Sequence, residues 1–163
     1  MTRKLKTQER SAPLTDAVAE AISLLTELGE ECRDVADNAP EATQSSARIE
    51  ALAASGDALA DIEEPDAPDA VDTSTVVSWT DALPSRPSRP LSRAARCANA
   101  VQALSAAVAG CDEQLDALEH TSTSTPAAAD EIAGRHDAIE EYRDALQQIV
   151  DDAEDCEFPG MFG

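Results

Sequence analysis

The sequence predicts an all-α fold with two antiparallel helical hairpins, whose simplest arrangement is one elongated four-helix bundle. Apolar residues recur at alternating spacings of three and four in four segments, a pattern typical of heptad-type helix seams. Alanine supplies 32 of the hydrophobic residues and only 2% of the chain is aromatic, so the seams are narrow and a β-sandwich is excluded. Two other arrangements stay open: the hairpins lie apart, or each pairs with another copy of the chain.

The first hairpin is expected over residues 11–64, after a basic N-terminal tail of residues 1–10. Pro13 suits the first turn of its first helix. The second helix is weaker, because Ser45 and Gly56 stand at seam positions. The seam of the first helix comprises Leu14, Val18, Ala21, Leu25, Leu28, Cys32 and Val35.

A proline-rich linker is expected at residues 65–90, which hold five of the nine prolines. Such a density of prolines makes a linker semi-rigid. Its apolar island runs from Val76 to Trp79. We consider two roles for Trp79: it holds the linker against the helices, or it anchors a partner protein.

The second hairpin is expected over residues 91–156, and its first helix has the most regular seam of the chain. Thr125 precedes Pro126, a pair typical of a helix start. An apolar C-terminal tail of residues 157–163 follows. The two seams comprise Ala94, Cys97, Val101, Leu104, Val108, Cys111, Leu115 and Leu118, and then Ile132, Arg135, Ile139, Tyr142, Leu146, Ile149, Ala153 and Cys156.

The charge balance points to a habitat of molar salt. Acidic residues number 33 against 12 basic ones, which gives a net charge of -21, and Lys4 and Lys6 are the two lysines. Carboxylates hold water and hydrated cations, and at about 1 M salt a Debye length of roughly 3 Å screens their repulsion. The composition resembles that of salt-in haloarchaea, so we expect a halophilic protein of a high-salt cytoplasm or of a virion. The competing interpretation, an ordinary acidic disordered protein, leaves the regular seams unexplained.

The sequence contains no motif for catalysis, for a cofactor or for a metal. Its four cysteines lack zinc-ligand spacing and occupy seam positions, where cysteine behaves as a small apolar residue. A disulfide between helices stays open. His120 and His136 are isolated, and we expect both to be solvated surface groups. We therefore expect no enzyme and, because no apolar run is long enough for a signal or a span, no membrane contact.

Two features interrupt the acidic pattern and are the candidate partner-binding sites. Residues 86–111 contain four arginines and no acid, although cations are electrostatically unfavourable at a helix start. These arginines either bridge acidic helix faces or bind an acidic partner; a nucleic acid is the weaker alternative, because the remaining surface repels phosphate. The tail contains both phenylalanines, and it either folds back over the helices or binds another protein. The candidate residues are Phe158, Met161, Phe162, Trp79, Arg86, Arg89, Arg93 and Arg96.

We therefore expect a non-enzymatic helical scaffold or adaptor that makes protein–protein contacts through its tail and its arginines. Homo-oligomerisation stays open. One version of this hypothesis is a structural component of a haloarchaeal virus, such as a capsid-associated or head–tail protein. The alternative is a regulatory or nucleic-acid-associated factor that uses the basic tail and the patch from Arg86 to Arg96.

Overall fold

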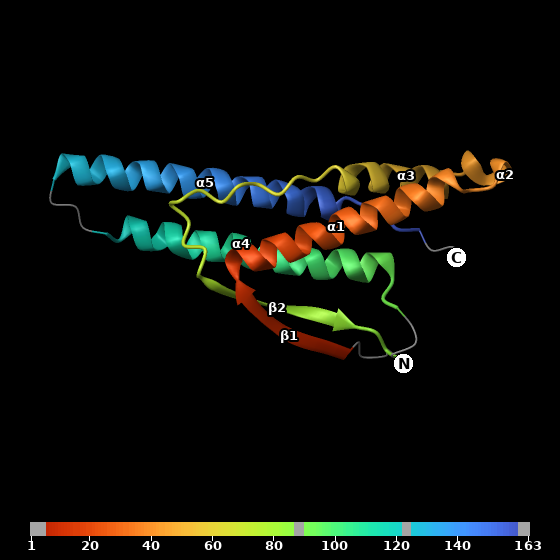
Figure 1. Cartoon of the computed structure of the whole chain (residues 1–163), viewed down its shortest axis with the longest axis horizontal. Coiled ribbons are helices and arrows are strands. Elements are labelled where there is room, and N and C mark those ends of the chain that lie inside the picture. Colours follow the sequence, from red (N-terminus) through yellow and green to blue (C-terminus); the bar gives the residue numbers. More distant parts are fainter. Residues whose placement is uncertain (1–5, 87–89, 122–124, 160–163) are drawn as a thin grey trace.

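The computed structural model describes residues 6–86, 90–121 and 125–159. Figure 1 shows an elongated molecule in which α1 and α3 form one end, α4 and α5 extend to the other, and α1 lies against α4 in the middle. The elements are β1 (Lys6–Pro13), α1 (Leu14–Asp37), α2 (Glu41–Gln44), α3 (Ala47–Ala60), β2 (Val76–Leu83), α4 (Arg93–Glu119) and α5 (Pro126–Glu154).

The helix α1 carries the apolar stripe that the sequence predicts. Of its seven expected seam residues, six are buried and Val35 is half-buried. Leu14, Leu25 and Leu28 are fully buried, and α1 as a whole packs on α3 and α4. The core is therefore a thin layer of leucine, alanine and valine along the helices, with Tyr142 and Trp79 as its aromatic members.

α1 and α3 pack antiparallel with their backbones in direct contact. A Cβ atom built on Gly29 would lie 2.3 Å from the backbone nitrogen of Ala60. A Cβ atom on Gly56 would lie 2.9 Å from the backbone nitrogen of Arg33. Only glycine permits such an approach. Gly56 adds no apolar side chain to the seam, but the absence of a side chain there lets the two helices come into contact. Arg33 then joins the helices through ion pairs with Asp57 of α3 and with Asp61, the residue just after α3.

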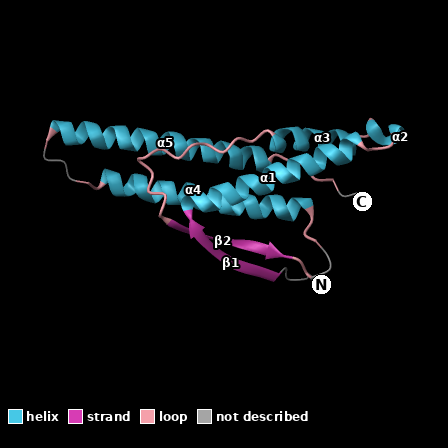
Figure 2. Cartoon of the chain, in the orientation of Figure 1, coloured by secondary structure: helices cyan, strands magenta, loops and turns pink. Residues whose placement is uncertain are grey.

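The prediction of an all-α fold is wrong, because β1 and β2 form a two-stranded antiparallel sheet (Figure 2). The strands pair from Lys6 opposite Leu83 to Pro13 opposite Val76. The sheet packs on α4 through Trp79 and its neighbours. The prediction of a four-helix bundle is also wrong, since α1 packs on α3 and α4, α4 packs on α5, and the sheet covers a further face of α4.

Asn99 of α4 attaches the sheet to the helix. Its Oδ1 accepts a hydrogen bond from the backbone nitrogen of Ala82 at 2.8 Å, and its Nδ2 donates to the carbonyl oxygen of the same residue at 3.1 Å. The Asn99 amide therefore takes the place of a third strand at this point of β2.

The segment between α3 and β2 lies along α5 and α4 (Figure 1). Val71 is buried, and Gln114 of α4 bonds both the backbone nitrogen and the carbonyl oxygen of Asp72, at 2.7 and 3.2 Å. The strand β2 lies inside residues 65–90, where the sequence predicts only a linker. The segment is thus attached to the helices over much of its length.

Candidate functional site

The chain segment after α5 is fixed to α3 by one serine. The Oγ of Ser55 accepts a hydrogen bond from the backbone nitrogen of Glu157 and donates one to its carbonyl oxygen, each at 2.9 Å. Phe158 is half-buried and packs against the core. Phe158, one of the three predicted partner-binding residues of the tail, thus packs against the core of its own chain. The other two, Met161 and Phe162, lie outside the described residues.

An apolar groove of about 650 Å³ opens beside this segment. The end of α1, the short α2 and the start of α3 form its walls, and Pro159 completes them. Asp34 and Arg48 are its charged lining residues. The apolar lining residues are Val35, Ala39, Pro40, Ile49, Leu52 and Pro159.

Three of the four cysteines come together near the same end of α5. Cys32 of α1 and Cys97 of α4 are buried, and Cys156, just after α5, is half-buried. Burial raises the pKa of Cys97 to about 12, and the thiols of Cys156 and Cys32 contribute to this shift. The fourth, Cys111, is buried elsewhere on α4, and burial raises its pKa to about 11. The sequence places all four on seams but does not show this grouping.

We expect thiol-alkylating reagents to modify the folded protein at Cys156 first and at Cys32, Cys97 and Cys111 slowly. Only the thiolate reacts, and a rise in pKa from 9.0 to about 12 lowers the thiolate fraction of Cys97 roughly 1,000-fold at pH 8. Mass spectrometry of timed samples in high salt measures the order. Labelling of the three buried thiols as fast as in denatured protein would contradict the structure.

Two of the four arginines of the patch, Arg93 and Arg96, are paired within the molecule. Arg93 Nε contacts Glu31 Oε1 at 2.8 Å, and Arg96 Nη2 contacts Glu31 Oε2 at 2.5 Å. Burial raises the pKa of Glu31, but the hydrogen bond and charge of Arg96, with those of Arg93, outweigh it and hold this pKa below its ordinary value. Arg86 is exposed, and Arg89 lies outside the described residues.

Trp79 is buried, with 6% of its surface exposed, so it holds the sheet onto the helices. Its indole nitrogen donates to Asp81 Oδ1 at 3.0 Å, and the guanidinium of Arg10 lies 5.2 Å from its ring centre. Arg10 also pairs with Glu20 and Asp81. The structure therefore favours the first of the two roles considered for Trp79 and places it away from the groove.

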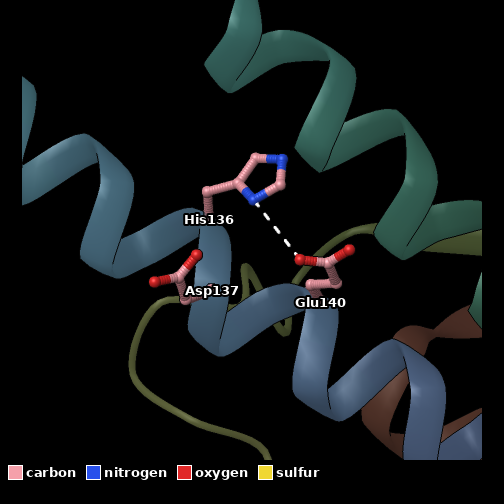
Figure 3. A group of neighbouring side chains, drawn as sticks. All are labelled: His136, Asp137 and Glu140. Atoms are coloured by element: carbon pink, nitrogen blue, oxygen red, sulfur yellow. Dashed lines mark ion pairs between the residues drawn. The ribbon is translucent and has the colours of Figure 1, made fainter.

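Figure 3 shows His136 with Asp137 and Glu140 on α5, a group whose ligand atoms lie within 4.8 Å of one another. The His136 ring lies between two glutamates, with Nδ1 3.8 Å from Glu140 and Nε2 3.9 Å from Glu119 of α4. Both carboxylates of the group are exposed. On so acidic a surface, such clusters are common without an ion, and we assign this one no function.

The chain matches no family model, no curated protein and no solved structure in comparisons with known proteins. Among the described residues, no helix is both long and apolar enough to span a membrane.

Proposed function

We propose that the chain is a non-enzymatic structural scaffold that associates with other protein chains through its groove and its C-terminal tail. The observation that carries the proposal is the apolar groove with Pro159 on its wall, on a chain whose net charge is -21. An apolar concavity on a strongly acidic chain marks a surface for protein contact.

The proposed occupant of the groove is the tail of a second copy. Four residues follow Pro159, and Met161 and Phe162 are the apolar ones among them. Groove and tail thus belong to the same end of one chain, and two copies that exchange tails make the same contact twice around a twofold axis. Burying a Met and a Phe contributes on the order of 1.5–3 kcal/mol for each side chain. At molar salt the repulsion between two such acidic chains is screened.

This association suits the structural component of a haloarchaeal cell or virus that the composition indicates. The alternative, a nucleic-acid-associated factor, gains less support. Glu31 neutralises part of the patch by pairing with Arg93 and Arg96, and molar salt weakens phosphate contacts. We also propose that the protein is located in a high-salt cytoplasm or in a virion.

We expect the full chain to be a dimer in high KCl, and a chain truncated after Pro159 to be a monomer. Ile49→Asp, which puts a charge into the groove, should have the same effect. Light scattering coupled to size exclusion measures the mass. Val76→Asp is the matched control, because Val76 is an exposed apolar residue on β2, outside the groove, and its loss should leave the dimer intact.

The thermal unfolding midpoint of each variant tests the other possible occupant of the groove, which is the chain's own tail. A monomeric full chain whose midpoint falls on truncation would show that the tail fills its own groove, and the proposed association would be wrong. A monomeric full chain whose midpoint is unaffected would also overturn it. A dimer that persists in both the truncated chain and Ile49→Asp would show that copies associate through another surface.

A further inference from the structure

A cavity of about 410 Å³ that is open to solvent lies between the start of α4 and the end of α5, apart from the groove. Two thiols, those of Cys97 and Cys156, line it. The remaining walls are mostly apolar, with Val101, Ala153 and Phe158 among them. Two cysteines that line one small and mostly apolar space are a feature that helix packing alone does not require.

The two sulfurs bond to neighbouring carbonyl oxygens, which limits the distance between them. Cys97 Sγ donates to the carbonyl oxygen of Ala153 at 3.4 Å, and Cys156 Sγ donates to that of Asp152 at 3.3 Å. Neighbouring carbonyl oxygens of a helix are about 3–4 Å apart, so the sulfurs lie within about 10 Å of each other. A change of χ1 rotamer moves a cysteine sulfur by about 3 Å, and the cavity leaves room for such a change.

Positive charge lies beside the Cys32 thiol, whereas the charged neighbours of the other two thiols are acidic: Glu154 for Cys97, and Asp152 and Asp155 for Cys156. Burial raises the pKa of the Cys32 thiol, and the charges of Arg93 and Arg96 act against this rise, so both guanidinium groups are within electrostatic reach of the thiol group. Arg96 Nε is buried, and no described residue accepts a hydrogen bond from it. A buried cationic donor without an acceptor is costly, and a thiolate at Cys32, which lies within electrostatic reach of Arg96, would reduce that cost.

We infer that Cys97 and Cys156 form a binding site for a soft monovalent metal ion, copper(I), with the Cys32 thiol next to it. Thiolate ligands select soft ions such as copper(I), which accepts two or three sulfur ligands. Zinc is less suitable, because it takes four ligands in a closed structural site. Binding replaces two S–H bonds by two Cu–S bonds and releases two protons, with no change of oxidation state. Arg93 and Arg96 lie within electrostatic reach of the Cys32 thiol next to this centre.

The test is an anaerobic titration of the reduced full-length protein with copper(I), in competition with a chromophoric copper(I) chelator. Potassium sulfate replaces KCl, because chloride also binds copper(I). We expect one ion per chain and an affinity that rises with pH, since two thiol protons must leave. Cys97→Ser and Cys156→Ser should each lose more affinity than the 10–100-fold that is typical for loss of a partner outside the metal's own ligands. Cys111→Ser is the matched control and should bind like the wild type.

A trivalent arsenical provides a second measurement. Phenylarsine oxide condenses with two neighbouring thiols, forming two As–S bonds and one water. Mass spectrometry should detect one bridged adduct on the wild type and on Cys111→Ser, and none on Cys97→Ser or Cys156→Ser. Circular dichroism confirms that each variant is folded, and Cys156, which is only half-buried, tolerates serine best. The inference is overturned if copper(I) does not compete with the chelator, if the two serine variants bind like the wild type, or if Cys111→Ser loses as much affinity as they do.

Discussion

Gly29→Ala should destabilise the protein by about 3 kcal/mol or more, although alanine is the better helix former. The new Cβ would lie 2.3 Å from the backbone nitrogen of Ala60 and 2.8 Å from its Cα. These are backbone atoms of α3, so no side chain can turn away, and the two helices must separate. Overpacking in a core costs about 1–3 kcal/mol and occasionally more, which exceeds the roughly 1 kcal/mol that alanine gains in a helix. Thermal or urea unfolding in high KCl measures the difference.

Gly134→Ala is the matched control for this experiment. Gly134 lies on α5, it is exposed, and a Cβ there would meet no atom within 4 Å. The same substitution should therefore raise the free energy of unfolding by about 0.5–1 kcal/mol. If Gly29→Ala were as stable as Gly134→Ala, the close packing of α1 on α3 would be wrong.

The helical content should depend strongly on salt. The chain has 33 acidic and 12 basic residues, so its acidic groups repel one another. The buried apolar layer that must hold the fold together against this repulsion is thin. We expect the circular dichroism signal at 222 nm to increase steeply between about 0.1 and 2 M KCl, the range over which the Debye length falls from about 10 Å to below 3 Å.

Two controls separate charge screening by KCl from its effect on apolar burial. An uncharged excluded solute such as sucrose strengthens apolar burial without screening charge, so it should restore less helix than KCl does. A variant in which exposed aspartates of α5 are replaced by asparagine should fold at lower salt; Asp130 and Asp137 are suitable positions. A fully cooperative helical fold in dilute buffer would contradict the halophilic interpretation.

The helical part of the fold could be predicted because its signal is local. The seam of α1 repeats within one segment, and six of its seven residues are buried as a heptad pattern requires. The sheet could not be predicted in the same way. β2 does alternate, with Val77 and Trp79 facing inward, but β1 is almost entirely polar and exposed. Its partner strand is far away in the sequence, so no local pattern indicates the pairing.

The candidate sites were partly accessible to sequence reasoning. The tail can be recognised in the sequence because its aromatic residues differ from the rest of the chain, whereas the groove depends on how α2 and α3 turn back on α1. A signal for the thiol pair was present: when two antiparallel helices are joined by a short turn, Cys97 near the start of one and Cys156 just after the end of the other come to lie opposite each other. The pairing of Arg93 and Arg96 with Glu31 required knowledge of how α1 and α4 cross.

The pairing of β1 with β2 has a consequence for synthesis on the ribosome. Pro13 pairs with Val76 and Lys6 with Leu83, so the first strand leaves the ribosome long before its partner exists. At 5–20 residues per second, that interval is roughly 3–15 s. During it, β1 has no ladder partner, yet Lys6, Glu9 and Arg10 keep it charged, and charged edge strands resist pairing with other chains. The polar character that hides this strand in the sequence also protects the nascent chain until β2 arrives.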